Sequence, residues 1–423
     1  MLLYLLAALT ALTAFVNVNV LPMDSERVLM NHTVLVDGDR IVRVGPAADV
    51  EVPDDAHVID ATGLWLMPGL AEMHGHIPPP SQPREELESV MYLYLAGGIT
   101  TVRGMLGWPG QLELRDAANS GQLLSPTLYL AGPSFNGQTV TSVEAARERV
   151  RTQVAEGWDL LKVHPGMSRE VYDAMAEEAN RLGIRFGGHV PQAVGLEHAI
   201  DMGQETFDHI DGYVELLGTM VPPDAAALAR IVEKSRDAGV WVVPTSVLWE
   251  TLLGVNSLEF LTSFPELKYV SAQTRASWEN IHRNRLASAM PEGPAIAENR
   301  KIILKALSDG GVGILMGTDA PQQFSVPGFS LHRELEYMVN AGMSPYEVLA
   351  SGTRNVGRYF ENEDVFGQVA EGHRADLVLL AANPLDDISA VATQQGVMIR
   401  GRWLPQADIQ ARLAEIEAYY AGQ

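Results

Sequence analysis

Short apolar segments alternate with amphipathic segments over most of this chain, and this rhythm constrains the fold more than any other feature. Segments such as Arg169–Leu182 and Pro223–Ala238 have the apolar spacing of helices. The apolar segments predict eight strands: Gly69–His74, Ile99–Arg103, Thr127–Ala131, Asp159–Val163, Ile184–Gly188, Thr206–Asp208, Val240–Pro244 and Gly313–Gly317. Eight strand–helix units over about 290 residues are what a (β/α)8 barrel requires. The predicted fold class is therefore α/β, a (β/α)8 TIM barrel.

An open, doubly wound sheet is the other fold that shows this alternation. Its nucleotide-binding version has no support, because no G-x-G-x-x-G motif follows an early strand. The one long interval lies between the seventh and eighth strands, where Ser257–Ser308 has a mostly helical pattern. We expect this segment to be an insertion at the mouth of the barrel.

Strand patterns also occur at both ends of the chain. Near the N-terminus Phe15–Ile59 is strand-like, and it contains the hairpin signal Asp37-Gly38. Towards the C-terminus the predicted strands are Ala375–Leu380, Val397–Arg400 and Arg402–Leu404. A closed barrel places its first and last strands side by side, so the segments that flank it emerge as neighbours. We therefore expect residues 1–63 and 358–423 to pair into a small β-sandwich domain beside a barrel of residues 64–357.

Composition excludes several classes of protein. Hydrophobic residues make up 47% of the 423 residues and charged residues 20%, which is a globular and not a disordered composition. The chain has no cysteine, so disulfides, Cys-ligated zinc, iron–sulfur clusters and a thiol nucleophile are excluded. Asp and Glu outnumber Lys and Arg by 53 to 30, which gives a net charge of -23. This balance argues against nucleic acid and against an anionic membrane surface as partners.

The segment Met1–Val16 is an apolar run with no preceding basic residue and no A-x-A cleavage pattern. Such a run is short for a membrane span, which needs about 20 residues. Three interpretations remain: a degraded export signal, a helix or strand packed on the body, or a weak membrane anchor. The location of the protein therefore stays open between the cytoplasm and export. No later segment has a transmembrane pattern.

The strongest chemical signal is the pair His74 and His76, in the segment LAEMHGH. Residues two apart on a strand point to the same face, so both imidazoles can converge on one metal ion. Imidazole is the commonest metal ligand in proteins. Two of them at strand spacing beside Gly75 are hard to explain by packing, although an isolated H-x-H is a weak signal.

Other predicted strands carry polar residues at or near their carboxyl ends, where barrel enzymes assemble their sites: Lys162, His189, His209 and Asp319. Each has an ordinary structural explanation. Lys162 can be a buried ion-pair partner, His189 can cap a strand, His209 can bond to a carboxylate and Asp319 can be a helix N-cap. An unpaired lysine at the end of an apolar strand is costly, however. Because these residues gather at one end of one predicted barrel, we interpret them jointly as a site for chemistry.

With these motifs the chain resembles the amidohydrolase superfamily. The branch it resembles is the imidazolonepropionase-like and Xaa-Pro-dipeptidase-like one, whose metal pair is bridged by a carboxylated lysine. The resemblance covers nearly everything from about Ala11 onward. Besides the H-x-H pair, it is carried by the segments Met67–Leu70, Gly98–Arg103, Gly317–Ala320, His332–Leu335, Ala341–Pro345, Gly372–Leu377 and Asn383–Leu385. These segments are specific for the superfamily and much less specific for a substrate.

The resemblance implies a site with two divalent metal ions, with zinc as the first choice. The implied ligands are, for the more buried ion, His74, His76 and Asp319, and for the more exposed ion, His189 and His209. Lys162, carboxylated on its amine (N6) by carbon dioxide, would bridge the two ions. Two ions acidify a bridging water enough to give hydroxide near neutral pH. Asp319 would be catalytic: it would take the proton from the attacking hydroxide and pass it to the leaving amine.

The chain departs from the family pattern at two places where a substrate would be recognised. Gly104 follows Arg103 where relatives often have Asp, and His164 stands where they often have Tyr. His164 is a candidate substrate contact, and Arg103 is a candidate partner for a substrate carboxylate, although a buried Arg near a strand is more often structural. Tyr213 is a candidate donor to the substrate carbonyl, with packing as the favoured alternative. The loops after the last two strands carry candidate lining residues, Trp249, Phe324 and Phe329.

The main hypothesis is a binuclear metal-dependent hydrolase that cleaves amide bonds of dipeptides or N-acyl amino acids. A lactone or organophosphate triester hydrolase is the first alternative, because the same hydroxide also attacks phosphorus. A non-catalytic metal-binding scaffold is the alternative of another class, and a fold that hosts many chemistries does not decide between them. The expected partners are a small-molecule substrate and further copies of this chain in a homo-oligomer.

Overall fold

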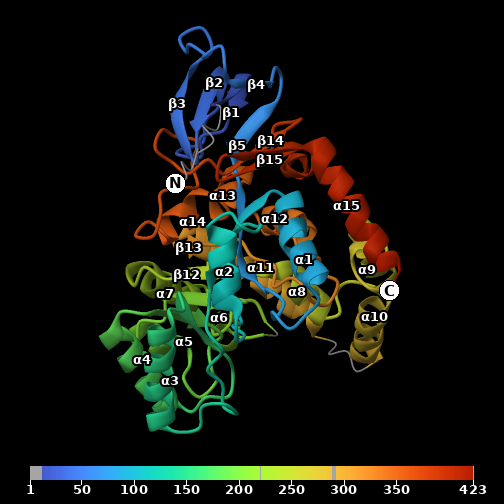
Figure 1. Ribbon diagram of the computed structural model, residues 1–423. Coiled ribbons are helices and arrows are strands. Elements are labelled where there is room, and N and C mark those ends of the chain that lie inside the picture. Colours follow the sequence, from blue (N-terminus) through green and yellow to red (C-terminus); the bar gives the residue numbers. More distant parts are fainter. Residues whose placement is uncertain (1–11, 220, 288–291, 423) are drawn as a thin grey trace, which may run out of the picture.

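Strands from both ends of the chain form one mixed sheet at one end of the molecule (Figure 1). The computed structural model describes residues 12–219, 221–287 and 292–422. The order of the sheet is β16-β15-β14-β5-β1-β2-β3, and β4 pairs with β1. Its strands are β1 (Thr13–Val20), β2 (Leu29–Asp37), β3 (Arg40–Pro46), β4 (His57–Asp60), β5 (Trp65–Pro68), β14 (Leu377–Leu380), β15 (Gln394–Ile399) and β16 (Arg402–Pro405).

The strands β1 and β5 hold this sheet together. β1 pairs antiparallel with β2 and parallel with both β4 and β5, and β5 pairs antiparallel with β14. Leu66 of β5 lies opposite Leu379 of β14, so the two chain ends share one ladder. The predicted pairing of the chain ends is confirmed. The two separate sheets of a sandwich do not form, because β1 and β5 connect all of these strands into one hydrogen-bonded sheet.

The apolar N-terminal run is described from residue 12 onward. Ala14 and Phe15 belong to β1 and are fully buried. Phe15 packs edge-on against Trp403 of β16, with ring centroids 5.2 Å apart. This part of the run is therefore a strand packed on the body. Residues 1–11, on which the export and anchor interpretations depend, lie outside the described residues.

Eight parallel strands form the second part of the fold. They lie in two arrays, β6-β7-β8 and β13-β12-β11-β10-β9. Their bounds are β6 (Leu70–Gly75), β7 (Ile99–Gly104), β8 (Thr127–Leu130), β9 (Leu160–Val163), β10 (Arg185–Gly188), β11 (Thr206–Asp208), β12 (Trp241–Val243) and β13 (Gly313–Ile314). Each overlaps one of the strands that the sequence predicts, and β13 is shorter than predicted.

Backbone hydrogen bonds join the two arrays at both of their seams. After β8, the N–H of Phe135 donates to the carbonyl of Lys162 in β9 at 2.8 Å. After β13, the N–H of Asp319 donates to the carbonyl of His74 in β6 at 2.8 Å. The eight strands thus follow one another in chain order around a ring, as the barrel interpretation requires. The second seam carries predicted site residues on both of its sides.

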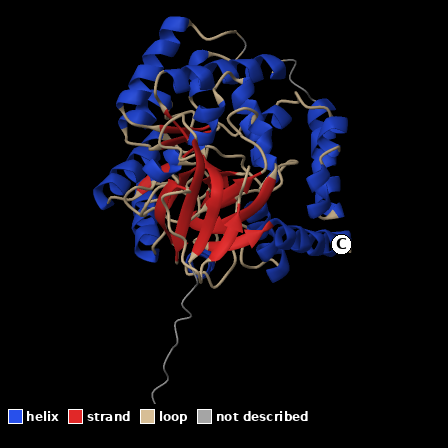
Figure 2. Ribbon diagram, turned by 90° about the horizontal axis from the view of Figure 1, so that it is seen from above, coloured by secondary structure: helices blue, strands red, loops and turns tan. Residues whose placement is uncertain are grey.

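Helices lie around the strands (Figure 2). The helices of the first six strand–helix units, between β6 and β12, are α1 (Arg84–Ala96), α2 (Gln111–Asn119), α3 (Val143–Glu156), α4 (Arg169–Leu182), α5 (Leu196–Asp201), α6 (Tyr213–Leu217) and α7 (Ala225–Asp237). Local signals explain their limits. At α4, the Ser168 hydroxyl accepts from the N–H of Val171, and Gly183 ends the helix at a φ of 73°.

The predicted helical insertion between the seventh and eighth strands is present. It contains α9 (Leu258–Thr262), the 3-10 helix η1 (Pro265–Tyr269), α10 (Ala272–Ala287) and α11 (Gly293–Asp309), and α8 (Ser246–Leu252) precedes it. The later helices are α12 (Phe329–Asn340), α13 (Pro345–Ser351), α14 (Arg354–Tyr359), the 3-10 helix η2 (Ile388–Ala392) and α15 (Gln406–Ala421).

The C-terminal helix α15 connects the mixed sheet to the barrel helices. Arg412 pairs with Glu85 of α1 at 2.7 Å, and Glu417 pairs with Lys268 of η1 at 2.8 Å. No helix in the described part of the chain is long and apolar enough to cross a membrane.

Candidate metal centre

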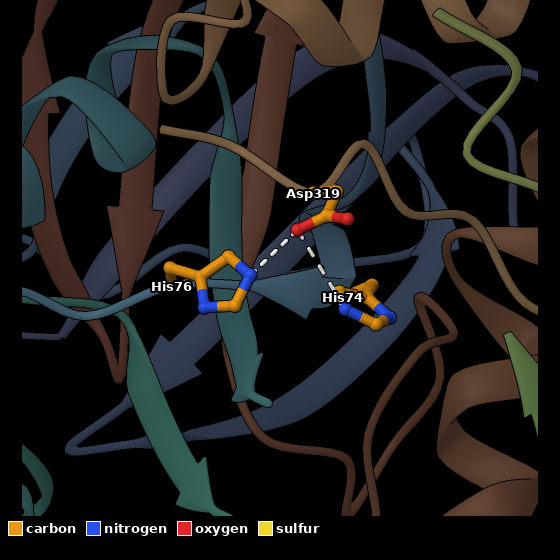
Figure 3. Close-up of side chains that lie close together, drawn as sticks. All are labelled: His74, His76 and Asp319. Carbon is orange, nitrogen blue, oxygen red and sulfur yellow. Dashed lines mark hydrogen bonds and ion pairs between the residues drawn. The ribbon is translucent and has the colours of Figure 1, made fainter. Parts of the chain in front are cut away.

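Two histidines of β6 and an aspartate after β13 form the centre of the site. Ligand atoms of His74, His76 and Asp319 all lie within 4.8 Å of one another (Figure 3). The Nε2 atom of His76 is 2.5 Å from Asp319 Oδ1, and the Nε2 atom of His74 is 3.7 Å from the same oxygen. The His74 side chain is 1% exposed and that of His76 is 24% exposed, so the cluster has a buried side and an accessible side.

The backbone presents Asp319 to the histidines from a left-handed conformation. Its φ is +66°, which is uncommon for residues other than glycine, and its N–H bonds to the His74 carbonyl. Burial raises the pKa of the Asp319 carboxyl, but the imidazoles of His74 and His76 outweigh this effect and bring the pKa to about 2. Asp319 is therefore ionised at neutral pH, as both a metal ligand and a proton acceptor require.

Lys162 of β9 reaches into the same cluster. Its Nζ atom lies 3.3 Å from His74 Nε2 and 3.7 Å from Asp208 Oδ2, and its side chain is fully buried. Burial lowers the pKa of the Lys162 amine, so its neutral form is easier to reach than in water. Gly188 leaves room for the lysine stem, because a Cβ there would lie 2.9 Å from Lys162 Cδ.

His209, which is buried, connects the cluster to the partly exposed His189. The ring centroids of His74 and His209 are 4.5 Å apart, and so are those of His209 and His189. His209 Nε2 lies 3.7 Å from Asp319 Oδ2. The structure therefore brings all the residues predicted as ligands to one place, while their binding of metal stays a prediction.

The Nδ1 atoms of three of these histidines each face an oxygen atom. The pairs are His74 with Asp208 at 2.8 Å, His189 with Asp211 at 2.6 Å, and His209 with Thr245 at 2.7 Å. A partner at Nδ1 fixes the orientation of the ring and leaves Nε2 for a metal ion, which is the usual arrangement around protein metal sites. The sequence did not single out these partners, although two of them, Asp208 and Asp211, are close to His209 in the chain.

Glu72 is a second group that the sequence did not single out. Its carboxyl accepts hydrogen bonds from the Thr318 N–H at 2.7 Å, the Thr318 hydroxyl at 2.5 Å and the His74 N–H at 3.0 Å. These bonds tie β6 to the residue before Asp319. Burial raises the pKa of Glu72 to about 8. The sequence could have indicated Glu72 through its spacing from His74, because residues two apart on a strand lie on the same face.

Arg103 is a structural residue, and its prediction as a partner for a substrate carboxylate is corrected. Its side chain is fully buried. Nε donates to the Met73 carbonyl at 2.6 Å, Nη1 to the Thr206 hydroxyl at 3.0 Å and Nη2 to Asp208 Oδ1 at 3.0 Å. Arg103 therefore holds Asp208, which in turn faces His74.

Tyr213 faces away from the cluster, so its prediction as a donor to substrate is also corrected. It is fully buried, and its hydroxyl lies 2.8 Å from the Ser235 hydroxyl of α7. Tyr213 is therefore a packing residue, as the favoured alternative stated. His164, in contrast, stacks on His189 with ring centroids 5.1 Å apart, and its role as a substrate contact stays a prediction.

Of the three aromatic residues that the sequence suggested as lining, one lies at the cluster and two lie elsewhere. Trp249 lies beside the site, with its ring 6.3 Å from the His209 ring. Phe324 and Phe329 instead pack on aromatic rings of the insertion, with centroid separations of 5.7 and 5.4 Å. The lining that the sequence suggested is thus reduced to Trp249 at this cluster.

The donor set fits divalent ions of the zinc type. It offers imidazole nitrogens and carboxylate oxygens, which zinc and similar metals accept. Burial and the neighbouring Lys162 hold the pKa of His74 well below its usual range, and burial and His74 do the same for His209. Both imidazoles are therefore neutral, which is the form that binds metal. Protonating several buried imidazoles around one carboxylate would cost free energy, whereas the same imidazoles in their neutral form can bind a metal ion.

Comparison with known proteins identifies relatives over nearly the whole chain. The model of the amidohydrolase family matches residues 65–404, which contain every site residue described above. The ochratoxinase of Aspergillus niger is 22% identical over 448 residues, with 89% of this chain and 82% of the relative covered. The imidazolonepropionase of Arthrobacter sp. (strain FB24) is 24% identical over 385 residues, with 84% and 89% covered.

Solved structures show the same fold. A Xaa-Pro dipeptidase with methionine bound in its active site matches with a TM-score of 0.71 at 21% sequence identity, and the match covers 93% of this chain and all of that chain.

Proposed function

The chain belongs to the amidohydrolase family, in its imidazolonepropionase- and prolidase-like branch, and from this premise we propose which bonds it cleaves and with which metals. As a family member it is a metal-dependent hydrolase that acts on C–N bonds, and the family implies the closed (β/α)8 barrel. We propose that its substrates are dipeptides or N-acyl amino acids. We propose further that two divalent ions, zinc in the first place, occupy the cluster.

The observation that carries this proposal is the convergence of Lys162 on the three-residue cluster. Its Nζ atom lies 3.3 Å from His74 Nε2, in the interior of the barrel. His74, His76 and Asp319 would hold one ion, and His189 and His209 the other. An unmodified amine is a poor bridge between two cations, whereas a carbamate on Lys162 would present one anionic oxygen to each ion.

Carboxylation of Lys162 would supply those oxygens. The neutral Nζ amine adds to the carbon of carbon dioxide, a C–N bond forms and one proton is released, which leaves a carbamate with two oxygens. The lowered pKa of the buried amine favours the neutral form that this reaction uses. Lys162 would then be a bridging ligand and Asp208, 3.7 Å away, a neighbour that limits where its head can lie.

The ions would supply Lewis acidity: they acidify water and polarise the amide carbonyl. Asp319 accepts a proton from the attacking water and delivers it to the departing nitrogen, so that the C–N bond breaks into a carboxylic acid and an amine. Its low pKa makes it available as the base in the resting enzyme. His74 and His209 stay neutral throughout, because burial, together with Lys162 beside His74 and His74 beside His209, holds the pKa of each imidazole well below its usual range.

The substrate class is supported by the relatives and by the accessible side of the cluster. One related structure is named a Xaa-Pro dipeptidase, and the branch as a whole includes prolidases. His76 and His189 are partly exposed where a substrate would enter, and Trp249 lies beside His209 as an aromatic neighbour of the cluster. A small amide with one apolar side chain fits these features.

The test combines metal analysis with a substrate panel. Purified protein is expected to hold two divalent ions per chain and to hydrolyse at least one member of a library of dipeptides and N-acyl amino acids. A chelator should abolish this activity and zinc should restore it. Turnover of a lactone or a phosphotriester without turnover of any amide would replace the proposal by the alternative hydrolase, and bound metal without any hydrolysis would favour a binding scaffold.

Lys162→Ala tests the carbamate separately. We expect this variant to lose activity and metal, and a short-chain carboxylic acid in the buffer to restore part of both. Lys234→Ala, a change on α7 that removes an ion pair with Asp201 away from the cluster, is the control and should retain both. Full activity of Lys162→Ala without added acid would contradict a bridging role for Lys162.

A further inference from the structure

A cavity of about 390 Å³ lies at the end of the strands opposite to the metal cluster. Trp241 and Gly313, the first residues of β12 and β13, line it, whereas Thr245 and Asp319 follow the carboxyl ends of the same two strands. These strands run parallel, so the cavity and the cluster are separated by the length of the barrel. Residues of α7, α11, α13 and α14 and of the adjoining loops also line it, and α7, α13 and α14 lie near β12 and β13 in Figure 1.

The lining is positive in a chain whose net charge is -23. It contains Arg236, Arg354 and Arg358, and Glu347 is the one acidic residue among the described residues that line it. Asp237 pairs with Arg236 at 2.8 Å, so that guanidinium is already compensated. Glu347 accepts the backbone N–H of Ser344 at 2.7 Å, in the cap of α13. Arg354 and Arg358 form no ion pair within the described part of the chain.

Aromatic side chains, not carboxylates, contact these two arginines. Arg354 Nη1 donates to the Tyr346 hydroxyl at 2.8 Å, while its Nε is buried and has no hydrogen-bond partner within the described part of the chain. The Arg358 guanidinium lies 5.9 Å from the centre of the Trp241 ring. Both residues stand one turn apart on α14 and face the same cavity. An arginine donor without a partner is costly, so a further acceptor beside the Arg354 guanidinium would be favourable.

Two of the three neighbouring carboxylates are engaged elsewhere. A second cavity shares Trp241 and Arg358 with the first and contains Glu205, Glu361 and Glu363. Arg185 binds Glu205 at 2.7 Å and Glu363 at 3.1 Å, so these two are held by a different cation. Glu361 lines the second cavity only, whereas Arg358 also lines the first.

We propose that this cavity is a second binding site, for a small ligand that carries a carboxylate or phosphate group, and that Arg354 and Arg358 bind this group. The planar guanidinium matches the two oxygens of such groups in a bidentate way. The volume lies in the range of small-molecule sites, and the Trp241 ring offers a flat apolar surface for the rest of the ligand. None of these residues belongs to the metal cluster, so the inference does not depend on the proposed function.

The test is calorimetric titration of the metal-loaded protein with two probes, inorganic phosphate and succinate, which separate a phosphate ligand from a carboxylate ligand. We expect saturable binding of at least one probe, weakened by added salt. Arg358→Gln should weaken that binding about tenfold or more, the effect of losing one charge-assisted contact. Arg230→Gln, an exposed change on α7 outside the cavity, is the control and should leave it unchanged.

Anions can also bind at the metal ions, and the variants separate the two places. Binding at the metals would compete with the amide substrate and would persist in Arg358→Gln. Binding of both probes with unchanged affinity in Arg358→Gln and in Arg354→Gln, or no binding of either probe, would overturn the proposal. Arg358 is exposed and forms no hydrogen bond in the described structure, so its replacement is expected to leave the fold intact and to keep the test decisive.

Discussion

His209 illustrates how a single side chain is prepared for chemistry. Its φ of +65° directs the imidazole into the barrel, and Thr245, itself at a φ of +48°, meets its Nδ1 atom at 2.7 Å. Two residues with uncommon backbone conformations thus share one hydrogen bond, and the Nε2 atom of His209 points towards Asp319, 3.7 Å from its Oδ2 atom. Such conformations cost free energy and tend to gather at functional sites.

Thr245→Val should weaken metal binding without unfolding the protein. Valine keeps the shape and the branched Cβ but removes the acceptor for Nδ1–H of His209, and loss of such a partner typically costs about 10- to 100-fold in metal affinity. The affinity is measured by competition with a metal-binding dye. Thr251→Val is the matched control, because the Thr251 hydroxyl bonds only within α8, to the Val247 carbonyl. Equal affinities of the two variants would show that Thr245 does not position His209.

Among the elements, the strand β10 depends on the absence of a side chain at one position. Gly188 has a φ of +122°, and a Cβ there would lie 2.5 Å from the Val163 carbonyl oxygen and 2.9 Å from Lys162 Cδ. The neighbouring strand β9 therefore holds Lys162 in the cluster only because β10 approaches it with a glycine.

Gly188→Ala is expected to destabilise the protein by about 3 kcal/mol, because both the backbone conformation and the contact with β9 become strained. Gly183→Ala is the control: its φ of +73° is also left-handed, but open space surrounds the added methyl group, and a cost of about 1 kcal/mol is expected. Thermal unfolding of the two variants checks the order. A Gly188 variant as stable as the Gly183 variant would contradict the close approach of the strands.

The contact between α12 and α8 contains a buried acid. Glu334 of α12 accepts the backbone N–H groups of Ser246 and Val247 at 2.8 and 2.7 Å, at the first turn of α8. Burial raises the pKa of Glu334 to about 7, against the partial opposing effect of these bonds. The folded protein therefore binds this proton more tightly than the unfolded chain does.

The sign of the pH effect follows from that difference. Below about pH 4.5 the acid is protonated in both states and has no effect, and as the pH rises towards 7 the unfolded chain gains stability by ionising first. The wild-type protein therefore loses stability over this interval, and Glu334→Gln should not, because glutamine does not ionise. We expect the free energy of unfolding of the variant, relative to that of the wild type, to increase by about 3 kcal/mol between pH 4.5 and 7. Urea unfolding at several pH values measures it. Glu336→Gln, exposed on the same helix, should show no such trend.

For the whole molecule, Arg374 is the residue that joins the mixed sheet to the barrel. It is 4% exposed, and it donates to Asp376 at 2.7 Å, to Asp364 at 2.8 Å and to the hydroxyl of Thr101 in β7 at 3.0 Å. One guanidinium thus connects the sequence before β14 with a barrel strand more than 270 residues earlier in the chain.

Arg374→Met should destabilise the folded chain by about 3 to 5 kcal/mol, because it leaves the buried Asp376 carboxylate without its cation. Arg43→Met is the control in the same sheet, since the pair of Arg43 with Glu371 is exposed and such pairs contribute little. The midpoints of thermal unfolding compare the two. If Arg374→Met unfolded at the same temperature as Arg43→Met, the junction would not depend on this cluster.

The sequence by itself determined those features that depend on residues close together in the chain. The eight barrel strands and the helical insertion follow from hydrophobic periods and from turn signals, which act over a few residues. The pairing of the chain ends follows in turn from the closure of the barrel that these strands predict. The H-x-H pair and the polar residues at the strand ends were visible for the same reason: a strand's carboxyl end can be recognised locally, and a barrel places all such ends together.

Only the tertiary structure decided what those residues contact. The sequence left Arg103 open between a substrate contact and a structural role, and the bond to Asp208, far along the chain, decided for the structural role. For Tyr213 it favoured packing, and the hydroxyl lies against Ser235. Glu72 gained its role from Thr318, and the single mixed sheet arose because β1 accepts three partners. A side chain's hydrogen bonds depend on neighbours brought together by folding, and no local pattern specifies them.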